Sequence, residues 1–170
     1  MWWCRAAALA LALMPIAACG FHPLYGGPAG ADTAQALAAI TIDPIPDRIG
    51  QILRNDLVDR LNPHGLPAHP AYRLKINVAK ATSPLAITTE AEVTRFKLTL
   101  KAHFALIDLD SGETVYSART RAVGSYDVVS SDFATLVAEQ DTTHRAARAV
   151  SEQIMTLLAV FFAGRLGPPG

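Results

Sequence analysis

The chain has 170 residues, of which 51% are apolar and 18% are charged, a composition typical of one globular domain. Its 15 basic and 15 acidic side chains give a formal net charge of zero. The totals argue against a nucleic-acid-binding protein, which would show a strong basic excess. The two cysteines, Cys4 and Cys19, both stand near the N-terminus. The rest of the chain therefore has no disulfide, no thiol nucleophile and no thiolate metal ligand.

Residues 1–18 have the pattern of a secretory signal peptide. Arg5 precedes a short apolar run at residues 6–14, and small residues stand just before Cys19. The run is about half of the ~20 residues that span a bilayer. Residues 16–19 read IAAC and resemble the bacterial lipobox, in which the cysteine is lipidated and the chain is cut before it. We therefore expect a lipid anchor on Cys19 that holds the chain on a membrane.

The segment after the cysteine predicts a spacer. Residues 20–36 are rich in glycine and proline, so we expect residues 19–36 to be a lipidated N-terminus and flexible tether. One domain would follow over residues 37–164, with a disordered tail at 165–170. In lipoprotein sorting, an aspartate after the cysteine is associated with retention at the inner membrane. Gly20 stands there instead, which implies the outer membrane, on its periplasmic side.

The first elements of the domain are a strand and a helix. Residues 38–43 form a short apolar run that ends at Pro-Ile-Pro. Asp47 is positioned to cap a helix, and leucines and isoleucines follow it at helical spacing up to Leu61. Residues 62–71 contain three prolines and predict a loop.

Three alternating segments then predict strands at residues 72–80, 93–107 and 114–126, since period-two alternation marks a strand with one covered face. Residues 108–113 predict a hairpin turn between the last two strands, and residues 81–92 join the first two, with strand structure extending into them. Ser130-Ser131-Asp132 gives an N-cap signal for a long helix to about residue 163, and a break at 141–143 is left open.

The element order is therefore β-α-β-β-β-α. The fold class that it predicts is α+β: a two-layer sandwich with two helices packed on one face of a four-stranded sheet. The pattern does not determine the order of the strands.

No motif in the chain supports catalysis. The five histidines have no metal-ligand spacing, and no nucleophile elbow or phosphate-binding loop is present in the sequence. We therefore expect no enzyme activity, no metal and no cofactor besides the lipid on Cys19.

Basic residues cluster in the predicted strands, where acidic residues are almost absent until the strand ends. Eight cations share these strands: Arg73, Lys75, Lys80, Arg95, Lys97, Lys101, Arg119 and Arg121. Alternation places most of them on the face opposite the helices, although Lys80 falls off that register. A cationic face attracts phosphate or carboxylate groups. Lysine and arginine also keep an open sheet face soluble and guard its edges, so both explanations stay open.

Four stretches of the chain together resemble the LptE family of lipopolysaccharide-assembly lipoproteins in its alphaproteobacterial form. They are CGFHPLYG at 19–26, IPDRIGQILRNDLVDRLNP at 45–63, AEVTRFKLTLKAHFALID at 91–108 and SYDVVSSDFATLVAEQDTTHRAARAVSEQI at 125–154. The first stretch is fairly specific, whereas the others share a general character with the family.

The resemblance implies a function without catalysis. A member of this family sits inside the LptD barrel at the outer membrane as a plug and assembly factor, binds lipopolysaccharide and supports its transport to the outer leaflet. The resemblance also implies the same helix-on-sheet fold. The candidate contacts with lipopolysaccharide are Arg73, Lys75, Arg95, Lys97, Lys101, Arg119 and Arg121. Alternatives are an auxiliary lipoprotein of an ABC-type lipid transport system and an anchored periplasmic hydrolase.

Overall fold

The computed structural model describes residues 28–63, 65–87 and 93–166. They form seven elements in chain order: α2 (Pro28–Ala38), β1 (Ile40–Ile42), α3 (Asp47–Leu61), β2 (Tyr72–Ile87), β3 (Val93–Asp108), β4 (Thr114–Asp127) and α4 (Asp132–Leu166). The predicted signal peptide and the lipidation site at Cys19 lie outside the described residues.

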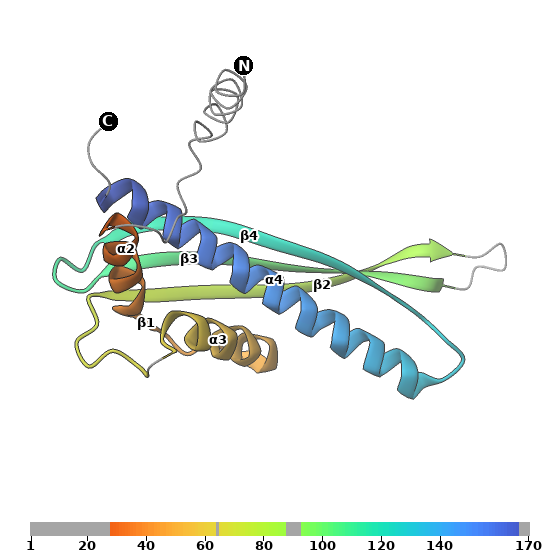
Figure 1. The fold of residues 1–170 in the computed structure, drawn as a ribbon. Helices are drawn as coiled ribbons and strands as arrows, with labels where there is room; N and C mark the ends of the chain where they lie inside the picture. Colours follow the sequence, from red (N-terminus) through yellow and green to blue (C-terminus); the bar gives the residue numbers. More distant parts are fainter. Residues whose placement is uncertain (1–27, 64, 88–92, 167–170) are drawn as a thin grey trace, which may run out of the picture.

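The four strands form one mixed sheet in the order β1-β2-β3-β4. The short β1 pairs in parallel with the start of β2, while β2, β3 and β4 are long antiparallel neighbours. All three helices lie on the same side of the sheet, and α4 crosses it along the length of β4 (Figure 1). The predicted α+β sandwich is confirmed, and the strand order, which the sequence left open, follows the order of the chain.

The N-terminal boundary of the domain differs from the prediction. We expected residues 20–36 to be an extended tether, but Pro28–Ala38 form the helix α2, so this part of the prediction is wrong. Leu37 and Thr33 are buried, and α2 packs against α4. The packing of this apolar side stabilises a segment whose glycines and prolines suggested none. The folded part of the chain thus includes residues 28–36, and the described residues form three helices where two were expected.

The ends of the other two helices are only partly as predicted. Asp47 does not cap α3 with its side chain: Pro46 is the N-cap residue, and Asp47 has a φ of 67°. In contrast, Ser131 caps α4 as expected, because its hydroxyl accepts a hydrogen bond from the amide of Ala134 at 3.4 Å. No break interrupts α4, which continues to Leu166, two residues into the predicted tail.

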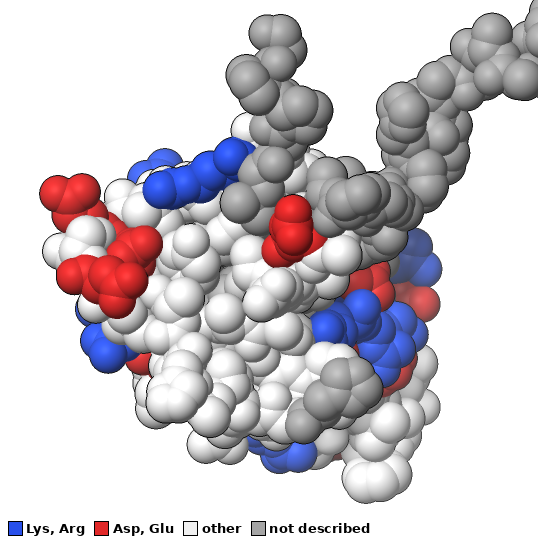
Figure 2. Space-filling model, turned by 60° about the vertical axis from the view of Figure 1, so that its left-hand side comes forward, with Lys and Arg blue, Asp and Glu red and all other residues white. Residues whose placement is uncertain are grey.

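The β3–β4 connection is the tight turn that was predicted between residues 108 and 113. One Asp108 carboxylate oxygen accepts hydrogen bonds from the amides of Asp110 and Ser111, both at 3.0 Å. The bond from Ser111, and to a smaller extent that from Asp110, lowers the pKa of Asp108. Gly112 has a φ of 74°, which favours glycine. In Figure 2, which brings the left-hand side of Figure 1 forward, separate basic and acidic groups stand on a mostly uncharged surface. This side of the molecule thus carries charges of both signs.

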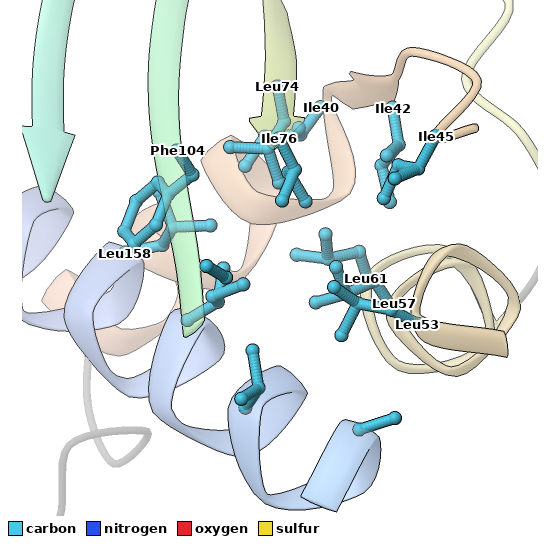
Figure 3. Close-up of a cluster of buried hydrophobic side chains, with 14 of the residues drawn as sticks. Ile40, Ile42, Ile45, Leu53, Leu57, Leu61, Leu74, Ile76, Phe104 and Leu158 are labelled. Carbon is cyan, nitrogen blue, oxygen red and sulfur yellow. The ribbon is translucent and has the colours of Figure 1, made fainter. Parts of the chain in front are cut away.

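The hydrophobic core fills the space between the helices and the sheet. Leu53, Leu57 and Leu61 of α3 point toward Leu74 and Ile76 of β2 (Figure 3), and all five side chains are buried. On the other flank, the fully buried residues Val150, Ile154 and Leu158 recur every four positions along α4. Fully burying a side chain of this size contributes roughly 1.5–3 kcal/mol.

The length and composition of α4 would also suit a membrane-crossing helix. Its buried residues, however, pack on the sheet as those of a core helix do. Helix α4 lies close to β4 at Gly124, where an added Cβ would be only 2.6 Å from Cγ2 of Thr142. The glycine therefore lets helix and strand approach closely at this point. In the last turns of α4, Leu158 and Phe162 are buried in the core, whereas Val160 is exposed.

Candidate anion-binding face

The face of the sheet turned away from the helices is lined by alternate residues of β2, β3 and β4. Leu98, Leu100 and Phe104 of β3 point into the core and are fully buried. The intervening residues Lys101 and His103 therefore point to the opposite face, and both are exposed. We call this surface the open face, since no described helix packs on it.

The strand register brings four of these side chains together. His103 is the direct partner of Arg119 on β4, and Lys101 is the direct partner of Arg121. Directly paired residues in a sheet have Cβ atoms about 5 Å apart, and alternate residues of one strand are about 7 Å apart. Lys101, His103, Arg119 and Arg121 therefore form a two-by-two group, which we call the cation block. All four residues are exposed.

An open hollow of about 680 Å³ lies beside the cation block. On β2, the partners of His103 and Lys101 are Asn77 and Ala79, and both line the hollow. These side chains are short, whereas the cations beside them are long, which explains the depression. No acidic residue is among the described residues that line it. A phosphate or carboxylate group in the hollow would thus meet cations without competition from a carboxylate.

Ion pairs divide the predicted cations into two groups. Arg95 donates to both carboxylate oxygens of Asp127, its direct partner on β4, at 2.5 and 3.2 Å. These hydrogen bonds, more than the attraction between the charges, raise the pKa of Arg95 and lower that of Asp127. Arg73 Nε lies 3.7 Å from an oxygen of Asp43 at the end of β1. The charges of Arg95 and Arg73 are therefore already balanced locally.

Lys80 lies on the helix side of the sheet, as its register predicted. Its ammonium donates to Glu139 of α4 at 2.8 Å. The five remaining cations form no ion pair with another described residue: Lys75, Lys97, Lys101, Arg119 and Arg121. Three of them belong to the cation block, which makes the block the strongest candidate for binding an anion.

A second cleft of about 350 Å³ lies between α3 and α4. It is lined by apolar residues such as Ile49, Ile52 and Leu136 and by charges of both signs, among them the Lys80–Glu139 pair. Paired charges give no preference for one sign of ligand. Among the described residues, no group of three or more His, Asp or Glu side chains could hold a metal ion.

Comparison with known proteins identifies the family. The family model for LptE, a lipopolysaccharide-assembly family, matches residues 37–158. The chain belongs to the LptE family. The uncharacterized protein RP188 of Rickettsia prowazekii is 29% identical over 126 residues, which cover 74% of this chain and 78% of that protein.

Solved structures of bacterial lipoproteins share the fold of this chain. A provisionally assigned lipoprotein of Caulobacter crescentus superposes with a TM-score of 0.64 and 27% identity, covering 79% of this chain and 98% of the other. Rare lipoprotein B of Shewanella oneidensis gives a TM-score of 0.58 over 74% of this chain and 96% of its own, and its 13% identity supports the fold alone. Membership in the LptE family assigns the chain to lipopolysaccharide assembly.

Two residues at the candidate site were missed from the sequence. From the sequence, His103 was considered only as a metal ligand, for which the histidine spacing gave no support, and Asn77 was assigned no role. The alternation did place both on the open face. The register between the strands, which decides that His103 lies beside Arg119, could be read only from the structure.

Proposed function

We propose that this LptE-family chain is an outer-membrane lipoprotein that binds lipopolysaccharide on the periplasmic side through the cation block. The observation that carries the proposal is the hollow on the open face. There, Lys101, Arg119 and Arg121 have no acidic partner among the described residues, and no acidic side chain lines the cavity.

The chemistry of the ligand supports the proposal. The lipid A part of lipopolysaccharide carries phosphate groups, and a phosphate suits both the planar fork of arginine and the compact charge of lysine. The hollow is wide and open, and it would admit a headgroup at a membrane surface. An anion held there would neutralise a group of like charges that the fold places side by side.

Binding to lipopolysaccharide can be tested with a triple variant. We expect Lys101→Gln/Arg119→Gln/Arg121→Gln to weaken binding at least about tenfold, since each charge-assisted bond contributes roughly 1.5–3 kcal/mol. The matched control is Arg48→Gln/Arg145→Gln/Arg148→Gln, which removes three exposed helix cations. Affinity would be measured by calorimetry in non-ionic detergent, with dephosphorylated lipopolysaccharide as a second ligand. Equal weakening by both triple variants would show that only net charge matters and would overturn the assigned site.

We further propose that Cys19 carries the lipid anchor and that the partner is the LptD barrel, in which the domain acts as plug and assembly factor. Cys19→Ala should abolish metabolic labelling with radioactive palmitate, and normal labelling of that variant would refute the anchor. Extraction of the wild-type chain in mild detergent should recover a large barrel protein. Recovery of inner-membrane permease subunits without a barrel would instead support an auxiliary role in an ABC-type transport system.

A further inference from the structure

His103 is the histidine of the cation block, and histidine is the side-chain type whose charge changes closest to neutral pH. It lies between Asn77 on β2 and Arg119 on β4, and it lines the same hollow as Lys101 and Arg121. Its side chain is exposed on the open face. Histidine gains a positive charge and a second N–H donor on protonation, whereas the other three members keep their charge across this range.

The charged side chains that face His103 among the described residues are all cations. Lys101 stands two residues away on the same strand, Arg119 and Arg121 face it from β4, and Lys75 lies on β2, two residues from its partner Asn77. No helix among the described residues covers this face, and no carboxylate lines the hollow. Without an anion, protonation of His103 adds a like charge to the block. With an anion in the hollow, the positive charge on protonated His103 is attracted to that anion.

We propose that His103 is part of the phosphate-binding site in the hollow. Through this residue, binding of phosphate on the open face is coupled to uptake of a proton. The inference rests on the proposed function, because it assumes that the hollow takes a phosphate group. Coupling is reciprocal: an anion that favours protonated His103 is itself bound more tightly when His103 is protonated. Binding of a phosphorylated lipid therefore strengthens as the pH falls from about 8 to about 5.5.

The size of the effect follows from the distance and the exposure. A unit charge about 5–7 Å from a phosphate, on a surface screened by salt, gives a modest gain, and we expect roughly a three- to tenfold change in affinity. The phosphate works in the opposite direction, because a phosphomonoester loses part of its negative charge below a pH of about 6. The pH profile of wild type alone therefore does not isolate His103.

The contribution of His103 to the pH dependence can be isolated by comparing variants. The affinity of the full-length lipidated chain for purified lipopolysaccharide would be measured in non-ionic detergent between pH 5.5 and pH 8.5. The proteins are wild type, His103→Gln and His69→Gln. Glutamine keeps a hydrogen-bond donor at position 103 but cannot be protonated. His69 is an exposed histidine of the 62–71 loop, outside the hollow, and serves as the matched control.

The ratio of wild-type affinity to His103→Gln affinity is the readout, because titration of the ligand cancels in it. We expect this ratio to rise roughly three- to tenfold toward pH 5.5, while His69→Gln follows wild type. A constant ratio in a wild type that binds would overturn the role of His103 and leave the proposed function intact. Absence of wild-type binding at every pH would overturn both. Thermal unfolding of the two variants checks that neither change acts through the fold.

Discussion

The two faces of the sheet are built by the same three strands and differ in what they contact. Leu98, Leu100 and Phe104 of β3 have no solvent exposure and pack beneath the helices, whereas the intervening Lys101 and His103 are exposed on the open face. One face therefore determines the stability of the domain, and the other is available to a ligand. The separation predicts that substitutions one residue apart affect different properties.

The largest effect is expected when two neighbouring residues of β3, one on each face of the sheet, are replaced in turn. Leu100→Ala should lower the free energy of unfolding by about 2–5 kcal/mol, because it leaves a cavity in a fully buried site. Lys101→Ala should change it by less than about 0.5 kcal/mol, as is usual for exposed positions, and should weaken binding to phosphorylated lipopolysaccharide. Denaturant unfolding and calorimetric binding give the two measurements. Comparable stability losses in the two variants would show that the faces are not independent.

A second prediction concerns how α4 approaches the covered face. Gly124→Ala places a Cβ 2.6 Å from Cγ2 of Thr142, so helix and strand must separate, at a cost of about 1–3 kcal/mol. Thr142→Ser removes that methyl group. We expect the double variant Gly124→Ala/Thr142→Ser to recover much of the loss, which a double-mutant cycle of unfolding free energies would measure. Additive losses would mean that the two residues do not oppose each other.

Much of this contrast was readable from the sequence. Period-two alternation in β2, β3 and β4 predicted which residues face the core and which face outward, because the pattern depends only on local geometry. It also placed Lys80 off the open face, where the structure pairs it with Glu139. The long helix α4 followed from its N-cap signal and its apolar spacing.

The rest depended on contacts between distant segments. Helix α2 was missed because its sequence begins among glycines and prolines, yet Pro28 stands at the first helical position, where proline is favoured, and Leu37 is buried. The partners across β3 and β4 depend on a register shift between Leu106 and Ile107. No local signal fixes that shift, so the sequence alone could neither pair Arg95 with Asp127 nor place His103 beside Arg119.

A smaller effect is expected when a paired cation of the open face is compared with an unpaired one. Arg95 is bound to Asp127 by two hydrogen bonds, so removing it withdraws little free charge from the face. Arg95→Gln should therefore weaken lipopolysaccharide binding less than Lys101→Gln does. Calorimetry on the two single variants would decide this, and equal losses would show that the ion pair opens when the ligand binds.

The pair also predicts a small dependence of stability on pH. Hydrogen bonds from Arg95 lower the pKa of Asp127 in the folded state. The stability that this gives is present above the ordinary aspartate pKa of about 3.9 and is lost as the pH falls through the lower folded-state value. Wild type should thus be slightly more stable than Arg95→Gln at pH 7, and the difference should shrink in acid. Since both side chains are solvent-exposed, the pair contributes little. Asp127→Asn should reproduce the same small loss, and adding Arg95→Gln to it should cost nothing further, because each change removes the same interaction.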